Sequence, residues 1–244
     1  MKISYSEKYR IKHNETDFNG ELSLASTGDL LLDAAGLHAL DIKTDISNLN
    51  TQNLTWVISG MKFKIFKMPC IHQEITVETK VSAYTKFTTQ RDFRIFDSQG
   101  QLMSEISSEW LIIDVNTRRP VFITEILPQL EQICQPQTPV EKYKRLRFSL
   151  LDNQKISTHK ISYPDIDINK HLYSMNYVRL ALSVFDTKKF SNKKISTMDI
   201  NFICEMLSDQ TAEIYLNDQE TTSQIDIKES QSGKSTFKAE INWI

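Results

Sequence analysis

The sequence predicts an α+β fold in which two similar halves follow one another, each with a long helix wrapped by an antiparallel sheet. Two observations predict this fold. A helical segment is followed by a meander of strand-like runs, which is the order expected when a helix packs on an antiparallel sheet. The same order then returns farther along the chain, which indicates an internal repeat.

The first half begins with a strand and an enclosed helix. Apolar residues recur from Tyr5 to His13 as they do in a half-buried strand. We expect a helix from Gly28 to Leu40, capped by Ser26-Thr27, and apolar residues lie around most of its circumference. Four strand-like runs follow, at Leu54 to Lys67, Glu74 to Ala83, Thr89 to Phe96 and Leu102 to Ile113.

The second half repeats the first with shorter loops. The segment Thr16 to Ser23 aligns with Ile166 to Tyr173, so Asp167 lies 150 residues after Asp17. The later landmarks align at smaller offsets: Phe63 with Phe202, Glu74 with Glu213, Gly100 with Gly233 and Trp110 with Trp243. We therefore expect an N-terminal unit at residues 1–130, a linker at 131–157 that includes Gln135 to Pro139, and a C-terminal unit at 158–244.

Composition excludes several classes of function. With 29 basic and 31 acidic residues the net charge is −2, so no global field attracts nucleic acid. The chain has neither a signal-peptide core nor a run long enough to span a membrane, and we expect a cytoplasmic protein. The cysteines are isolated and the histidines lack HxxxH spacing, so we expect no metal and no cofactor.

A polar cluster stands at the start of the second predicted helix. Two acids, an amide and an imidazole fall within seven residues, in the order Asp165, Asp167, Asn169 and His171. A structural alternative is a turn with an Asx cap. An acid at Glu205, after the apolar Phe202-Ile203-Cys204, is unusual for a core position.

The repeat marks this cluster as specific to one half. The first half has Glu21 where the second has His171, and Phe66 where the second has Glu205. This asymmetry is the pattern expected when one copy of a duplicated fold reacts and the other holds an apolar ligand.

These residues resemble the acyl-acyl-carrier-protein thioesterases of plant plastids and bacteria over nearly the whole chain. The first half carries a similar tryptophan strand at Trp56 and a Thr-Arg-Arg turn at Thr117 to Arg119. The second half carries the Asp-x-Asp-x-Asn-x-His signature, a downstream tyrosine at Tyr177 and the later acid Glu205. The resemblance implies a tandem (double) hotdog fold.

The resemblance also implies thioester hydrolysis to a free fatty acid, which ends chain elongation in fatty acid biosynthesis. Asp167 and Glu205 would hold and deprotonate a water, His171 would orient them and shuttle protons, and Asn169 would fix the geometry or polarise the carbonyl. A direct attack by Asp167 to give an acyl-enzyme anhydride is the alternative mechanism at this stage. Met206, where plant members often carry cysteine, excludes a thiolate nucleophile there. We expect Asp165 to be scaffolding, and Cys204 to be a core residue on the strand face opposite Glu205.

Substrate contacts follow from the same resemblance. The residues expected to line an acyl tunnel are Leu30, Leu31, Ala34, Leu37 and Trp56. The partner would be an acidic acyl carrier protein, so a basic rim is expected, with candidates at Lys188 to Lys194, Arg118-Arg119 and Lys142 to Arg147. A homodimer is left open.

Two alternatives remain at this stage, another hotdog enzyme and a non-catalytic acyl-binding protein. An enoyl hydratase of this fold resembles Asp-x-Asn-Pro-x-His, whereas here His171 follows Asp167 by four residues and no proline follows Asn169. An acyl-CoA thioesterase would share the site. The intact polar cluster argues against a protein that only binds.

Overall fold

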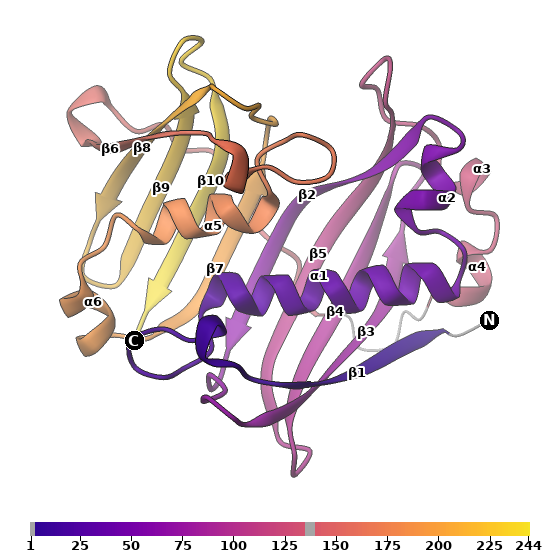
Figure 1. Ribbon diagram of the computed structural model, residues 1–244, viewed down its shortest axis with the longest axis horizontal. Helices are drawn as coiled ribbons and strands as arrows, with labels where there is room; N and C mark the ends of the chain where they lie inside the picture. The colour runs from indigo at the N-terminus through magenta and orange to yellow at the C-terminus, as the bar shows by residue number, and fades with distance from the viewer. Residues whose placement is uncertain (1–2, 135–139) are drawn as a thin grey trace. The chain divides into compact units, whose positions relative to one another are not determined.

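The computed structural model describes residues 3–134 and 140–244, and the chain divides into two compact units, Met1–Lys142 and Tyr143–Ile244 (Figure 1). The segment Gln135 to Pro139, predicted as part of the linker, lies outside the described residues. Each unit contains helices and an antiparallel sheet, as the α+β prediction requires.

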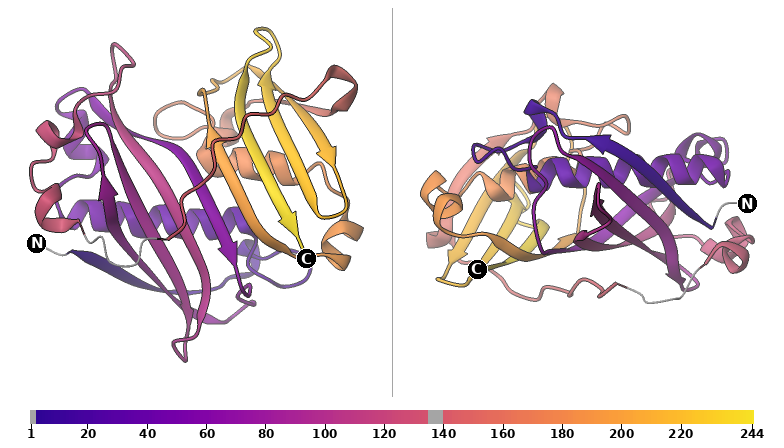
Figure 2. Two further views of the ribbon diagram at one scale, coloured as in Figure 1. Left: turned by 180° about the vertical axis from the view of Figure 1, so that it is seen from behind. Right: turned by 90° about the horizontal axis from the view of Figure 1, so that it is seen from below.

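The N-terminal unit is a five-stranded antiparallel sheet in the order β1-β3-β4-β5-β2. Figures 1 and 2 show helix α1 lying across one face of this sheet. The elements are β1 (Ser4–Arg10), η1 (His13–Glu15), α1 (Leu24–Asp41), α2 (Ile46–Asn50), β2 (Leu54–Ile65), β3 (Glu74–Tyr84), β4 (Thr88–Asp97), β5 (Leu102–Asp114), α3 (Ile123–Ile126) and α4 (Leu130–Ile133).

Helix α1 starts earlier than predicted. Its N-cap is Ser23, whose hydroxyl accepts the Ser26 N–H at 3.1 Å. Ser26 and Thr27, predicted as the cap, instead lie in the first turn, where the Thr27 hydroxyl donates to the Ser23 carbonyl at 2.9 Å. The Ser23 hydroxyl accepts one of the N–H groups that have no partner at the start of the helix, so Ser23 is the cap. The predicted cap was therefore wrong by one turn.

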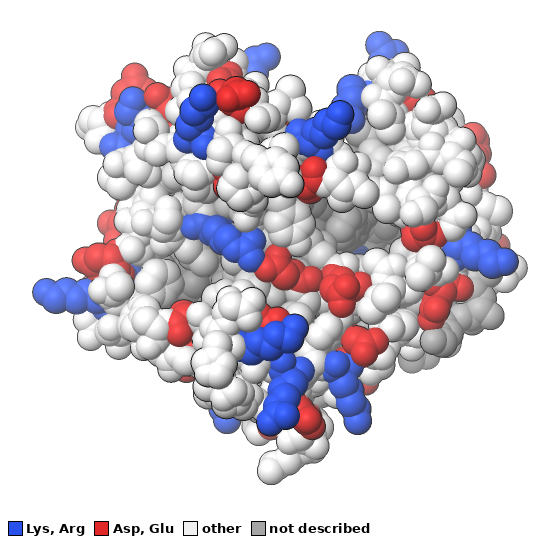
Figure 3. All heavy atoms as spheres, in the orientation of Figure 1, with Lys and Arg blue, Asp and Glu red and all other residues white. Residues whose placement is uncertain are grey.

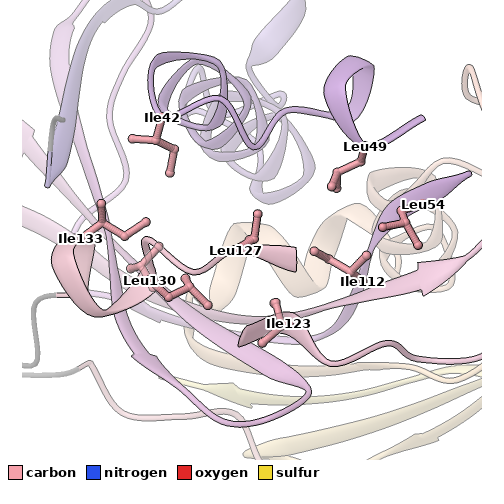
Figure 4. Close-up of a cluster of buried hydrophobic side chains, with 9 residues drawn as sticks. Ile42, Leu49, Leu54, Ile112, Ile123, Leu127, Leu130 and Ile133 are labelled. Carbon is pink, nitrogen blue, oxygen red and sulfur yellow. The ribbon is translucent and has the colours of Figure 1, made fainter. Parts of the chain in front are cut away.

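An apolar cluster closes one end of the N-terminal unit (Figure 4). The end of α1, helix α2, strands β2, β3 and β5 and the short helices α3 and α4 all contribute to it. Its buried members are Ile42, Leu49, Leu54, Val81, Ile112, Ile123, Leu127, Leu130 and Ile133. Trp56 packs against this cluster and donates its indole N–H to the Thr44 carbonyl at 2.7 Å.

The C-terminal unit has the same strand arrangement, in the order β7-β10-β9-β8-β6. Its helix α5 is half as long as α1, 9 residues against 18. The elements are η2 (Asp152–Gln154), β6 (Lys155–Lys160), η3 (Tyr163–Asp165), α5 (Ser174–Leu182), α6 (Thr187–Asn192), β7 (Ile195–Phe202), β8 (Thr211–Asp218), β9 (Thr222–Glu229) and β10 (Ser235–Trp243). Strand β6 begins inside the range predicted as linker.

An extended segment at residues 143–150 crosses the sheet face opposite α5 (left view of Figure 2). Asp199 and Asn201 of β7 each accept a backbone N–H from it at 2.8 Å. From β9, Lys228 donates to the Leu150 carbonyl at 2.9 Å. On the other face of the sheet, the ring of Tyr177 from α5 stacks on Phe237 of β10. The chain before β6 is thus held by side chains of the sheet.

Backbone pairing gives a more accurate alignment of the two units. The Leu22 N–H donates to the Pro69 carbonyl at 2.7 Å, and the Leu172 N–H donates to the Met206 carbonyl at 2.7 Å. Arg10 pairs with Glu74, and Lys160 pairs with Thr211. The predicted match of Glu74 with Glu213 was therefore wrong by two residues. The predicted match of Phe63 with Phe202 was wrong by the same amount, because Phe63 pairs with Ile106 of β5 and Ile200 pairs with Ala239 of β10, each four residues before the matched tryptophan.

Among the residues that the structure describes, no helix is long and apolar enough to cross a membrane.

Candidate active site

The turn at Asp167 to His171 is built by its own first carboxylate. One Asp167 oxygen accepts the N–H groups of Asn169 at 2.8 Å and His171 at 3.2 Å, while the Asp167 N–H donates to the His171 carbonyl at 2.8 Å. The Asx-turn alternative therefore describes part of the role of Asp167. Its other carboxylate oxygen makes no hydrogen bond to the described residues.

Asp165 is a scaffold residue. Its Oδ2 accepts hydrogen bonds from the Ser162 N–H at 2.8 Å, the Ser162 hydroxyl at 2.9 Å and His159 at 3.0 Å. Burial alone would raise the pKa of Asp165, but these hydrogen bonds outweigh it and lower the pKa. The carboxylate is therefore committed to holding the start of the loop.

The N-terminal unit contains the same turn without the imidazole. Asp17 accepts the N–H groups of Asn19 at 2.8 Å and Glu21 at 3.1 Å. A turn of this geometry therefore forms whether or not a histidine ends it. The two turns carry different ionisable groups at their fifth position, His171 in one unit and Glu21 in the other.

Glu205 lies in a loop and not on a strand. Strand β7 ends at Phe202, and the N–H groups of Ile203 and Cys204 both donate to the Thr236 carbonyl, at 2.8 and 3.2 Å. This bifurcated contact breaks the alternation of faces, so Cys204 is exposed. The prediction of Cys204 as a core residue was wrong for that reason.

Backbone contacts bring the Glu205 loop to the histidine. Leu207 forms an isolated antiparallel bridge with His171, next to the bond between Leu172 and Met206. The result is a His171 Nε2 to Glu205 Oε2 distance of 3.5 Å. The side chains of His171 and Glu205 are 21% and 36% exposed, so the pair is accessible and partly dry.

Tyr177 ties helix α5 to the Glu205 loop. Its hydroxyl donates to the Cys204 carbonyl at 3.2 Å, and its ring stacks on Phe237 with centroids 5.5 Å apart. Burial raises the pKa of Tyr177, and the nearby negative charge of Asp167 raises it further. Tyr177 therefore remains a neutral donor that fixes the residue next to Glu205.

The start of α5 offers donors for an anion. Its N-cap is Tyr173, which makes no side-chain cap, whereas Ser23 caps α1 in the other unit. N–H groups in a first helical turn have no partner within the helix and point toward the helix start. Among the described residues the Asn169 side chain makes no hydrogen bond, so its amide is also available to a ligand.

The position that matches Glu205 in the N-terminal unit is Met68. Met68 precedes Pro69, and Glu205 precedes Met206, the two residues whose carbonyls accept the equivalent bonds from Leu22 and Leu172. The predicted match with Phe66 was therefore wrong. Met68 is half-buried and apolar, so the contrast between the two units remains.

The predicted substrate residues all lie in the N-terminal unit. Leu30, Leu31 and Ala34 are buried on α1, while Leu37 and Trp56 are half-buried. Trp56 packs against the buried cluster, and its indole ring meets that of Trp110 edge to face, with centroids 6.4 Å apart.

The predicted basic candidates differ in availability. Lys189 is occupied, because its ammonium lies 2.6 Å from Asp218 and over the ring of Trp243. The segment Lys144 to Arg147 lies on the sheet face opposite α5, away from His171. Figure 3 shows basic and acidic side chains interspersed over one face of the molecule, without a large patch of either sign.

The described residues contain no group of three or more metal-ligating side chains.

Comparisons with known proteins place this geometry in a family context. Residues 2–130 match the acyl-ACP thioesterase N-terminal domain and residues 149–244 match the acyl-ACP thioesterase C-terminal domain. An acyl-ACP thioesterase from Bacteroides thetaiotaomicron has a TM-score of 0.88 at 25% identity, covering 99% of this chain and 98% of that one. The 12:0-ACP thioesterase of Umbellularia californica superimposes with a TM-score of 0.89 at 17% identity, covering 100% of this chain and 98% of that one, which shows the shared double hotdog fold.

The curated relatives are longer than this chain. The oleoyl-acyl carrier protein thioesterase 2 of Arabidopsis thaliana chloroplasts is 22% identical over 192 residues, covering 72% of this chain and 52% of the relative. The chain thus spans about half the length of the curated relatives that it matches.

Proposed function

Because the chain belongs to the acyl-ACP thioesterase family, we propose that it hydrolyses acyl-[acyl-carrier-protein] thioesters to free fatty acid and carrier protein. This reaction would end chain elongation in fatty acid biosynthesis. The observation that carries the proposal is the His171–Glu205 pair, 3.5 Å apart on two loops joined by backbone bonds. The other unit has Glu21 and Met68 at these positions.

Glu205 is the general base in this proposal. Its carboxylate, beside His171, would take a proton from a water that attacks the thioester carbonyl, and a positioned base contributes about 10²- to 10⁴-fold to a rate. His171 would orient Glu205 and return the proton to the leaving thiolate. The buried Met206 has no thiol to offer as an alternative nucleophile at this point of the loop.

Asp167 and Asn169 would position the carbonyl. One oxygen of Asp167 accepts the N–H groups of Asn169 and His171 and so would orient both side chains. The second Asp167 oxygen would help to hold the water. N–H groups of the uncapped first turn of α5 would donate hydrogen bonds to the oxyanion. In other enzymes the loss of one such donor costs about 3 to 4 kcal/mol of transition-state stabilisation. The N-terminal unit would hold the acyl chain among Leu30, Leu31, Ala34, Leu37 and Trp56.

The test is a panel of acyl-carrier-protein thioesters of different chain lengths, with released thiol titrated over time. We expect hydrolysis by the wild type and a loss of at least about 10²-fold in kcat for His171→Ala and for Glu205→Gln. Glu21→Gln is the matched control at the twin position and should keep its activity. Full activity in either site variant would remove that residue from the mechanism, and no release from any chain would refute the proposed reaction.

The same panel tests the nearest alternative. An acyl-CoA thioesterase would use the same site but need no carrier protein. Equal kcat/KM for matched acyl-CoA and acyl-carrier-protein substrates would favour that function.

A further inference from the structure

The turn that carries the reactive groups has a second, outward side. Along Asp167 to His171 the half-buried and exposed residues alternate: Asp167, Asn169 and His171 are half-buried, and Ile168 and Lys170 are exposed. Ile168 is 79% exposed, so the outer side of the turn presents an apolar side chain. Tyr163, eight residues before His171, is 88% exposed.

Lys170 occupies a backbone conformation that disfavours it. Its φ is 65°, in the left-handed region, where the side chain of an L-residue crowds the following carbonyl. Gly20 stands at the matching position of the N-terminal unit, with a φ of 72°. Glycine adopts this conformation without that crowding. The C-terminal unit therefore has a lysine at a position where the backbone favours the glycine of the N-terminal unit.

The Lys170 ammonium is available to a partner. Among the described residues it has no ion pair and no hydrogen bond. Neighbouring cations are engaged: Lys160 lies 3.3 Å from Asp209, and Arg179 donates to the Asn176 side chain at 2.9 Å. The Asx turn holds the Lys170 backbone, since the Lys170 N–H donates to the Asp167 carbonyl at 2.9 Å.

We infer that Ile168, Lys170 and Tyr163 form the docking lip for the anionic surface of the carrier protein, with Lys170 as its cation. The inference rests on the proposed function, because it names the partner of that same site. A carrier protein delivers its thioester on an arm joined to the protein through a phosphodiester. The outer side of the turn borders His171, so a cation there attracts the negatively charged carrier protein toward the site. The exposed side chains of Ile168 and Tyr163 would add apolar contact area to the electrostatic attraction of Lys170.

The experiment measures binding of the holo carrier protein, which has a free thiol and no acyl chain, by fluorescence anisotropy. Lys170→Glu should weaken binding at least about tenfold at low salt, because an attractive charge pair becomes repulsive. Lys43→Glu is the matched control, because Lys43 of the N-terminal unit is also an exposed lysine with a left-handed backbone, at a φ of 59°. It should bind like the wild type.

Lys170→Gly separates docking from folding. The glycine of the twin unit removes the backbone crowding, so the thermal midpoint should be retained while carrier binding weakens at least about threefold. Unchanged carrier binding in Lys170→Glu, or an equal loss in Lys43→Glu, would overturn the inference.

Hydrolysis of an acyl-pantetheine, which lacks both protein and phosphate, gives an independent reading. Its kcat/KM should be the same in wild type and Lys170→Glu. A large fall would show that Lys170 maintains the geometry of the turn, and would overturn its proposed role in docking. If the wild type binds the carrier but hydrolyses no thioester, the proposed reaction fails and the docking lip stands.

Discussion

At the residue scale, His171 and Glu205 differ from the acids around them in what their side chains do. Asp165 and one oxygen of Asp167 are occupied by backbone and side-chain donors of their own loop. The His171–Glu205 pair instead joins two loops. The scaffold role of Asp165 could be predicted from the sequence, because an acid before a polar turn has backbone N–H groups within reach.

Tyr177→Phe tests how firmly the Glu205 loop must be held. The variant loses the hydrogen bond to the Cys204 carbonyl and keeps the ring stack on Phe237. We expect the free energy of unfolding to fall by about 1 kcal/mol and kcat to fall several-fold, because a buried acceptor loses its donor. Thermal unfolding and thiol release measure the two effects. Unchanged kcat would show that Glu205 is positioned without Tyr177.

Asp165→Asn should affect stability more than activity. Because the folded-state pKa of Asp165 is lowered, its stabilisation is present above the unfolded-state pKa, about 3.9, and is lost as pH falls through the folded-state value. At pH 7 we expect the variant to be about 1 kcal/mol less stable, with kcat nearly unchanged. The gap in thermal midpoint between wild type and variant should narrow between pH 5 and pH 3, and a constant gap would contradict the assignment.

At the element scale, the ends of elements account for what the sequence could not predict. Strands β2 to β5 lie close to their predicted ranges, because alternating apolar residues define strand interiors well. Glu205 was placed on a strand because nothing local marks the end of β7 at Phe202. That end depends on the carbonyl of Thr236, a contact between residues far apart in sequence. The start of α1 likewise depends on a single cap, because the Ser23 hydroxyl accepts the Ser26 N–H.

Ser23→Ala tests the cap of α1. The Ser23 hydroxyl accepts the Ser26 N–H at 3.1 Å, and its removal leaves that donor to water. We expect a loss of about 1 kcal/mol in the free energy of unfolding, measured by urea denaturation, with an unchanged m-value. Ser26→Ala is the comparison variant. A larger loss for Ser26→Ala than for Ser23→Ala would return the cap to the position predicted from the sequence.

At the scale of the whole molecule, the duplication explains both the success of the fold prediction and one error in it. Two copies of one plan predicted two similar units, and both contain antiparallel sheets of the same strand order. The alignment through Phe66 failed because it continued the offset of the Phe63–Phe202 match, whereas strand pairing matches Phe63 with Ile200. A sequence offset is interrupted by each insertion, whereas the bonds from Leu22 and Leu172 identify equivalent residues directly.

The proposed division of labour between the units predicts two separable kinetic effects. Ala34 is fully buried on α1 in the N-terminal unit, so Ala34→Val adds volume where the acyl chain is proposed to lie, at a cost of about 1 to 3 kcal/mol in stability. We expect the variant to shift preference toward shorter chains while kcat on its best substrate stays near the wild-type value. Glu205→Gln in the C-terminal unit should instead lower kcat by a similar factor for every chain length, because the base acts on a carbonyl common to all of them. Profiles of kcat and KM across the same acyl-carrier-protein panel distinguish these outcomes. A uniform loss in Ala34→Val, with no change in chain preference, would show that this part of α1 supports the fold and does not contact the substrate.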